Sequence, residues 1–132
     1  MKKFVVELTK TVNGVPFGAS RAQIREMFGT DFKEMKKAPT SRNTMDAYKF
    51  CEVFYTPDNK FEAVEFFVEE AELIVDSEKV PTDYAQFVEW LNARDLQNEE
   101  NDDGIISKKC GVGVYAPDKK IETILLSTAQ YF

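Results

Sequence analysis

Two stretches of this chain, 60 residues apart, have nearly the same sequence. Residues 55–64 are YTPDNKFEAV and residues 115–124 are YAPDKKIETI, with Tyr, Pro, Asp, Lys and Glu identical at corresponding positions. In each copy a Pro-Asp turn separates two runs of strand-forming residues, which predicts a β-hairpin. Because a hairpin alone is marginally stable in water, we expect both to belong to an antiparallel sheet around which the rest of the chain folds.

A short amphipathic helix is predicted before each hairpin. In the first helix Ser20 is the N-cap, Gln23 completes a capping box three residues later, and Gly29 ends the helix. In the second, Asp83 caps a helix over residues 84–94. The two helices align at an offset of 63 residues, close to the offset of the hairpins.

The repeated order of helix and hairpin predicts an internal duplication within a single domain, residues 1–132. The pseudo-repeats cover about residues 15–76 and 81–132. The expected fold class is α+β: an antiparallel β-sheet with helices packed on one face, built from two tandem helix-plus-hairpin repeats. The alternative is a chance likeness between two amphipathic helices and two hairpins.

Local patterns predict the remaining elements. Residues 4–8 and 71–75 are expected strands, and Asn13-Gly14 is expected to form a tight turn. Residues 30–45 are expected to form a loop with at most one helical turn, and residues 97–104 an acidic loop. That loop does not bind calcium in the manner of an EF-hand, because no glutamate occupies the twelfth position.

Strand alternation assigns the hairpin side chains to the two faces of the sheet. With Tyr55 opposite Phe61, the face expected to cover the helices holds Phe50, Phe54, Val64, Phe66 and Val68 with Val112, Val114, Ile124 and Leu126. The opposite face is unusual, because a sheet face that meets only water should be polar. The large apolar side chains assigned to it are the candidate partner-binding residues: Tyr55, Phe61, Phe67, Tyr115, Ile121 and Leu125. The alternative is that the N-terminal strand, residues 30–45 or a dimer partner covers this face.

The composition limits the chemistry that the chain can perform. It has no histidine, which excludes Ser-His-Asp triads, Cys-His dyads and nearly all zinc sites. Glu62 and Glu122 occupy equivalent repeat positions, and ion pairs with Lys60 and Lys120 are their expected role. We therefore predict a non-enzymatic protein with no catalytic residues, no metal site and no cofactor.

The net charge of −6 is unevenly distributed. Residues 1–49 carry ten basic and five acidic side chains, whereas residues 50–105 carry three basic and sixteen acidic ones. A net acidic chain does not suit nucleic acid, and the acidic middle suits a basic protein partner. The expected state is a monomer or a homodimer.

The chain is expected to be cytoplasmic. No run approaches the roughly 20 apolar residues that span a membrane. Glu7 interrupts the apolar stretch near the N-terminus, so no signal peptide is predicted. Cys51 and Cys110 are assigned to opposite faces of the sheet and are expected to stay unbonded in a reducing compartment.

Residues 15–29, VPFGASRAQIREMFG, resemble the opening helix of two related groups, the β-lactamase-inhibitor-protein-like domains and the small outer-membrane-assembly lipoproteins. The shared pattern is a glycine, a small residue, Ser or Thr, and a helix that ends in an apolar residue and Gly. The resemblance implies a helix-plus-antiparallel-sheet fold, in tandem in the inhibitor, and protein binding through the sheet. Those groups are exported, and each half of the inhibitor carries a disulfide, whereas each half here has one cysteine.

Small acidic cytoplasmic proteins of this build also resemble immunity proteins, which neutralise a partner toxin, and phage-encoded inhibitors. The leading hypothesis is therefore a non-enzymatic protein-binding module, an inhibitor or immunity protein that binds its target through the exposed sheet face. Two alternatives stay open. One is a small enzyme or ligand-binding domain with a carboxylate–tyrosine pocket, and the other is a structural homodimer that closes its sheet faces on each other.

Overall fold

An eight-stranded antiparallel sheet is the largest element of the structure, a computed structural model that describes residues 1–132. Both predicted hairpins are confirmed, and their second strands pair with each other at the middle of the sheet. In spatial order the strands are β10 (Glu99–Asn101), β11 (Gly104–Ser107), β12 (Val112–Tyr115), β13 (Thr123–Ser127), β7 (Phe61–Phe67), β6 (Cys51–Tyr55), β5 (Thr44–Ala47) and β4 (Lys33–Lys36).

A second, smaller sheet has five strands and one parallel pairing. The predicted strands near the N-terminus and after the first hairpin are confirmed as β1 and β8, and they run parallel to each other. Their adjacency was not predicted, because nothing local to either segment identifies its partner. In spatial order the strands are β3 (Val15–Pro16), β2 (Thr11–Val12), β1 (Lys2–Glu7), β8 (Ala71–Val75) and β9 (Glu78–Lys79).

Two helices, α1 (Arg21–Phe28) and α2 (Tyr84–Asn92), begin at the predicted caps. The Ser20 hydroxyl accepts a hydrogen bond from the Gln23 backbone N–H at 3.2 Å, and the Gln23 side chain accepts from the Ser20 N–H at 3.0 Å. Asp83 accepts from the N–H of Gln86 at 3.1 Å. These caps satisfy backbone donors that the first turn of a helix leaves without partners.

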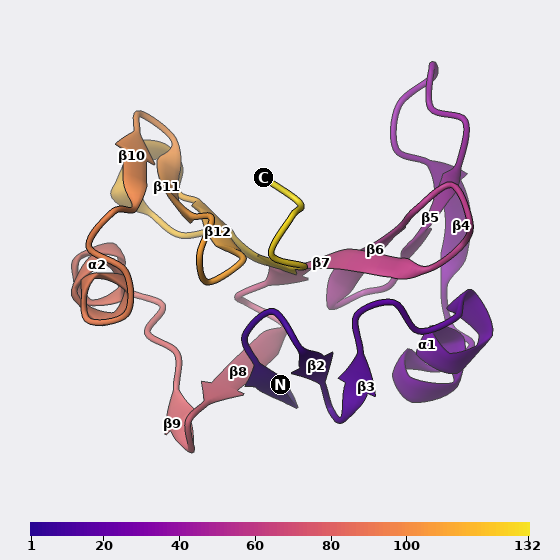
Figure 1. Cartoon of the computed structure of the whole chain (residues 1–132), viewed down its shortest axis with the longest axis horizontal. Coiled ribbons are helices and arrows are strands. Elements are labelled where there is room, and N and C mark those ends of the chain that lie inside the picture. Colours follow the sequence, from indigo (N-terminus) through magenta and orange to yellow (C-terminus); the bar gives the residue numbers. More distant parts are fainter.

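Both helices and the smaller sheet cover one face of the large sheet (Figure 1). The helices lie at opposite ends of that face, and the five-stranded sheet lies between them. The last residues of the chain cross the other side. We call the helix-covered side the inner face and the other side the outer face. The α+β architecture of two helices and largely antiparallel sheets is thus as expected, with a second sheet added.

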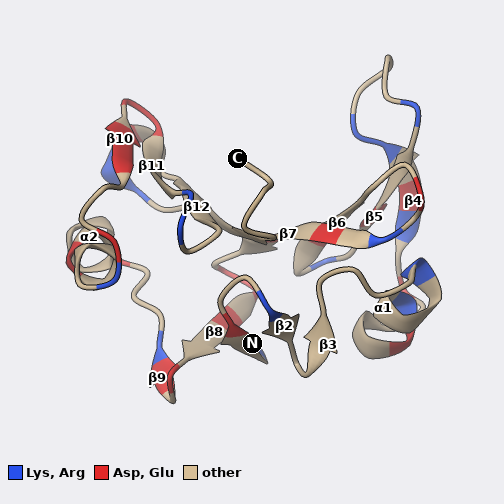
Figure 2. Cartoon of the chain, viewed as in Figure 1, with Lys and Arg blue, Asp and Glu red and all other residues tan.

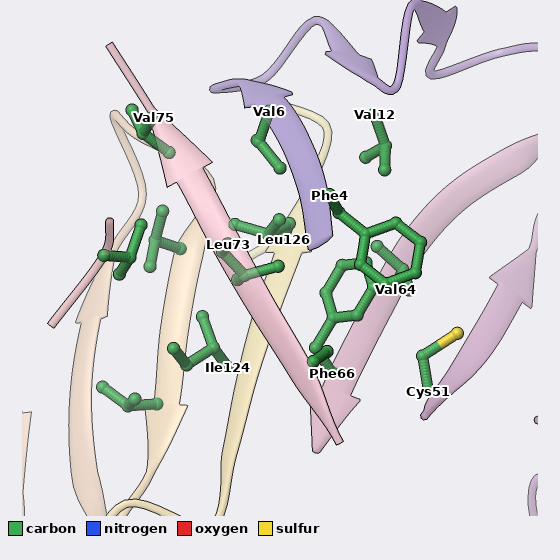
Figure 3. Close-up of a cluster of buried hydrophobic side chains, with 14 of the residues drawn as sticks. Phe4, Val6, Val12, Cys51, Val64, Phe66, Leu73, Val75, Ile124 and Leu126 are labelled. Carbon is green, nitrogen blue, oxygen red and sulfur yellow. The ribbon is translucent and has the colours of Figure 1, made fainter. Parts of the chain in front are cut away.

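Aromatic side chains form the middle of the main core. Phe4 of β1 packs against Phe66 of β7 and Phe28 of α1, with ring centroids 4.7 and 5.6 Å apart. Figure 3 shows Phe4 and Phe66 in one core with the aliphatic side chains of β8 and β13. Both cysteines are free, as predicted, but Cys51 and Cys110 both contribute to this core and do not lie on opposite sides of the sheet.

Two segments that were expected to be loops form the outermost strands of the large sheet. β4 lies within residues 30–45, and β10 within the acidic stretch 97–104. Both are short and highly charged, with sequences KEMK and EEN. Charged residues are common on edge strands because they discourage pairing with other chains. Local composition therefore indicated a loop where ladder hydrogen bonds to a neighbouring strand form an edge.

Replacing Phe4 by alanine should lower the free energy of unfolding by about 3–5 kcal/mol, because it leaves a cavity between the two sheets. Phe4 is 4% exposed, whereas its neighbour Val5 is 60% exposed. Val5→Ala is therefore the matched control and should change stability by less than about 0.5 kcal/mol. Urea unfolding of both variants checks this. Equal effects would mean that β1 does not pack as described.

Candidate functional site on the outer sheet face

A β-bulge in the first hairpin decides which side chains reach the outer face. Tyr55 pairs with Phe61, as predicted, but Phe54 pairs with Ala63. Strand β7 therefore has one extra residue, Glu62, at this point. A bulge of this kind shifts the alternation of side chains by one position. As a result Tyr55 and Phe61 point inward, and Phe54 points outward.

The structure divides the six candidate residues into two groups. Tyr55, Phe61 and Ile121 are buried in the main core, at 6%, 1% and 4% exposure. The prediction that these three form a binding surface is wrong. The other candidates lie on the outer face, where Tyr115 is 46% exposed and two residues are half-buried, Phe67 and Leu125.

Tyr55 and Tyr115 do not occupy equivalent positions. Tyr115 pairs with Thr123 in the second hairpin, whereas in the first hairpin the corresponding pair is Phe54 with Ala63. The expectation that both tyrosines lie on the same side of the sheet is therefore wrong, and the bulge is the physical reason.

Tyr55 belongs to a buried ionic cluster that sequence reasoning missed. Its hydroxyl donates to Asp46 Oδ2 at 2.8 Å, and Asp46 has no exposed surface. The Arg25 guanidinium donates to both oxygens of Asp46, from Nε at 2.9 Å and from Nη2 at 2.8 Å. The Arg21 guanidinium lies 4.0 Å from the centre of the Tyr55 ring. The arginines, one helical turn apart on α1, were the only sequence feature that pointed to such a cluster.

The titration of these groups follows from burial and from their hydrogen bonds. Burial, together with the hydrogen bond to Asp46, raises the pKa of Tyr55. The hydrogen bond to Asp46 also raises the pKa of Arg25, and Arg25 in turn lowers the pKa of Glu34. All three shifts favour the paired state, so the cluster holds α1 onto β5. Because Asp46 is enclosed, this carboxylate–tyrosine pair does not form an open pocket.

The outer face contains one continuous row of side chains that crosses all eight strands. Each member is paired with the next by the strand register, so all lie on the same face. From β10 to β4 this central row is Glu99, Ile106, Gly113, Leu125, Glu65, Glu52, Ala47 and Lys33. Its ends have opposite charge, and Figure 2 shows the acidic β10 and the basic residues around β4 at opposite ends of the molecule.

The last residues of the sequence cover part of the outer face. Tyr131 packs against the cluster of Met45, Phe54 and Ala63, and its hydroxyl accepts a hydrogen bond from Lys37 at 3.3 Å. The ring of Phe132 lies over Gly113, where an added Cβ would be 3.3 Å from it. Self-coverage of this face was one of the predicted alternatives, and it holds for the part beneath these two rings.

Two carboxylates face each other near the middle of the central row. Glu52 and Glu65 are directly paired across β6 and β7. The Thr123 hydroxyl donates to Glu65 Oε2 at 2.6 Å. Burial and the nearby charge of Glu65 raise the pKa of Glu52, and Lys37 acts in the opposite direction. Like charges directly opposite in a sheet are destabilising, so the fold alone does not favour this pair.

The predicted ion pairs at the two turns are absent. Neither Glu62 nor Glu122 forms an ion pair, because the bulge at Glu62 and the irregular backbone before β13 replace regular alternation. Cavities near the face are small or open. One of about 390 Å³ adjoins Phe67 and is lined by side chains of both charges, and one of about 250 Å³ lies between Glu65, Tyr115 and Phe132.

A comparison of the chain with protein-family models, curated proteins and solved structures finds no match. Neither helix has the length and apolar character needed to cross a membrane.

Glu52→Gln should raise the free energy of unfolding near neutral pH by up to about 1 kcal/mol, because it removes one of two opposed carboxylates. The pKa of Glu52 is higher in the folded chain than in the unfolded chain, so the wild type loses stability as the pH rises through that interval. The gain should therefore vanish below about pH 4 and be complete near neutrality. Urea unfolding across this range checks it. A pH-independent gain, or a loss at neutral pH, would contradict the geometry.

Asp46→Ala should destabilise the fold by about 3–5 kcal/mol, because it leaves Arg25 and Tyr55 without their shared partner. Glu34→Ala is the control, since Glu34 also bonds Arg25, at 2.7 Å, but its side chain is 48% exposed. That change should remove no more than about 1 kcal/mol. Thermal and urea unfolding measure both. Similar losses for the two variants would show that the buried carboxylate is not what holds α1 in place.

Proposed function

We propose that this protein is a non-enzymatic protein-binding module, an inhibitor or immunity protein, that binds its target through the uncovered part of the outer sheet face. The observation that carries the proposal is the composition of that face. It combines an exposed tyrosine, half-buried apolar side chains and carboxylates without cationic partners. A sheet face that met only water would be more uniformly polar.

Tyr115, Phe67 and Leu125 are the contact residues retained from the sequence analysis. They lie on adjacent strands, with Thr123 paired to both Tyr115 and Phe67. Tyrosines and other aromatic residues surrounded by polar groups are typical of the energetically important centres of protein interfaces. The carboxylates in the central row suit a basic partner, because charge complementarity steers association and selects among partners.

An internal duplication is part of the proposal. Each helix is followed by a four-stranded antiparallel meander, β4 to β7 after α1 and β10 to β13 after α2. The central pairing supports the same idea, since residues 60 apart pair symmetrically: Glu65 with its counterpart Leu125, Ala63 with Ser127, and Phe67 with Thr123. This arrangement is compatible with the resemblance to tandem β-lactamase-inhibitor-protein-like domains, which bind proteins through a sheet.

The two unbonded, buried cysteines support a reducing cytoplasm as the place of action. Burial, with Glu52 and Asp46 nearby, raises the pKa of the Cys51 thiol, so little of it is in the reactive thiolate form near neutral pH. We therefore assign neither cysteine a chemical role.

The decisive variant is Tyr115→Ala. A tagged chain recovers its partner from the native cell, and the affinity of the purified partner is then measured for wild type and variant. The change should weaken binding by about 2 kcal/mol, roughly 30-fold, and alter the free energy of unfolding by less than about 0.5 kcal/mol.

Leu96→Ala is the matched control, because Leu96 is 87% exposed and lies outside the outer face. It should affect neither binding nor stability. Unchanged binding by Tyr115→Ala would contradict the proposal. Self-association that is lost in Tyr115→Ala, with no other protein recovered, would favour the structural homodimer.

A further inference from the structure

We propose that the Glu52–Glu65 pair is the anchor point for an arginine of the protein partner, which places its guanidinium between the two carboxylates. This inference rests on the proposed function, because it specifies what the outer face recognises. Its evidence is independent of Tyr115: it comes from the strand register, the unmatched charge and the apolar surroundings of the pair.

The register fixes the two carboxylates side by side. Glu52 and Glu65 are direct cross-strand partners on neighbouring strands, so their Cβ atoms are separated by roughly 5 Å. A guanidinium presents several donors in one plane and can bond two carboxylates at once. Ammonium groups are more strongly hydrated and less directional, so arginine suits this spacing better than lysine.

The chain itself does not neutralise the pair. Glu65 accepts a hydrogen bond from the neutral Thr123 hydroxyl, and Glu52 forms no side-chain hydrogen bond or ion pair. Lys37 is the cation whose field reaches Glu52, but its ammonium lies 4.4 Å from the centre of the Phe54 ring and bonds Tyr131. The like-charge repulsion therefore remains in the free protein, and an incoming cation would relieve it.

Apolar groups border the pair on the same face. Leu125 and Ala47 flank it along the central row, and Phe67 and Phe54 lie two residues from the carboxylates along β7 and β6. An arginine side chain has an apolar stem and a cation that packs well on aromatic rings, so this combination matches its chemistry. The hollow of about 250 Å³ between Glu65, Tyr115 and Phe132 leaves the Glu65 side of the pair open.

A library of random peptides displayed on phage tests the inference without knowledge of the natural partner. The full chain is the bait, and selected peptides are then measured against three proteins. They are the wild type, Glu52→Gln/Glu65→Gln, and a control, Glu26→Gln/Glu89→Gln, which removes the same charge from exposed helix positions.

We expect the selected peptides to be enriched in arginine and to bind the Glu52→Gln/Glu65→Gln protein at least roughly tenfold more weakly, with unchanged binding to the control. Replacing the peptide arginine by citrulline, which keeps the shape and removes the charge, should cause a similar loss. The glutamine variant should unfold at a temperature equal to or above that of the wild type, which separates lost recognition from lost folding.

Two results would overturn the inference, and they differ in what they say about the proposed function. Peptides that lose binding to Tyr115→Ala but bind Glu52→Gln/Glu65→Gln as tightly as the wild type would leave the outer face as a binding surface without an arginine anchor. Peptides that are insensitive to all these changes would place the binding surface elsewhere and contradict both proposals.

Discussion

The pairing of β7 with β13 is the contact on which the rest of the structure depends. It joins two four-stranded meanders into one sheet, and its register fixes which side chains share a face from one edge to the other. Inward, it aligns Val64 with Leu126 and Phe66 with Ile124, so that both halves contribute to one core. The same pairing sets Glu65 beside Leu125 on the outer face. Core and candidate site are therefore two sides of one pair of strands.

The features that the sequence predicted correctly are local ones. Helix caps depend on residues three apart, and the hairpins depend on turn residues between strand-forming runs, so both could be recognised without tertiary information. The bulge at Glu62 could not, because one extra residue in a strand has no distinctive composition. Its effect was large, since every assignment on β6 changed face. Half of the candidate site was lost to this single shift, while positions on β13 and the far end of β7 kept their predicted side.

The buried cluster around Asp46 illustrates a different limit. Arg25 and Asp46 are 21 residues apart, and only the folding of β5 against α1 brings them together. Ile105, at the matching place in the other meander, faces Val114 as Asp46 faces Val53. An apolar residue is thus compatible with this position of the sheet. The ionic version adds directional bonds that fix α1 in one orientation, at the expense of removing charges from water.

The parallel pairing of β1 with β8 has a consequence for how the chain assembles. Residues 2–6 pair with residues 71–75, so the first strand to leave the ribosome has no parallel neighbour until more than half of the chain has been made. Contacts between segments this distant close late, because the entropy of the intervening loop opposes them. During synthesis the apolar side of β1, which includes Phe4 and Val6, therefore stays without its final partners. The N-terminal strand is a late part of the fold despite being the first part of the sequence.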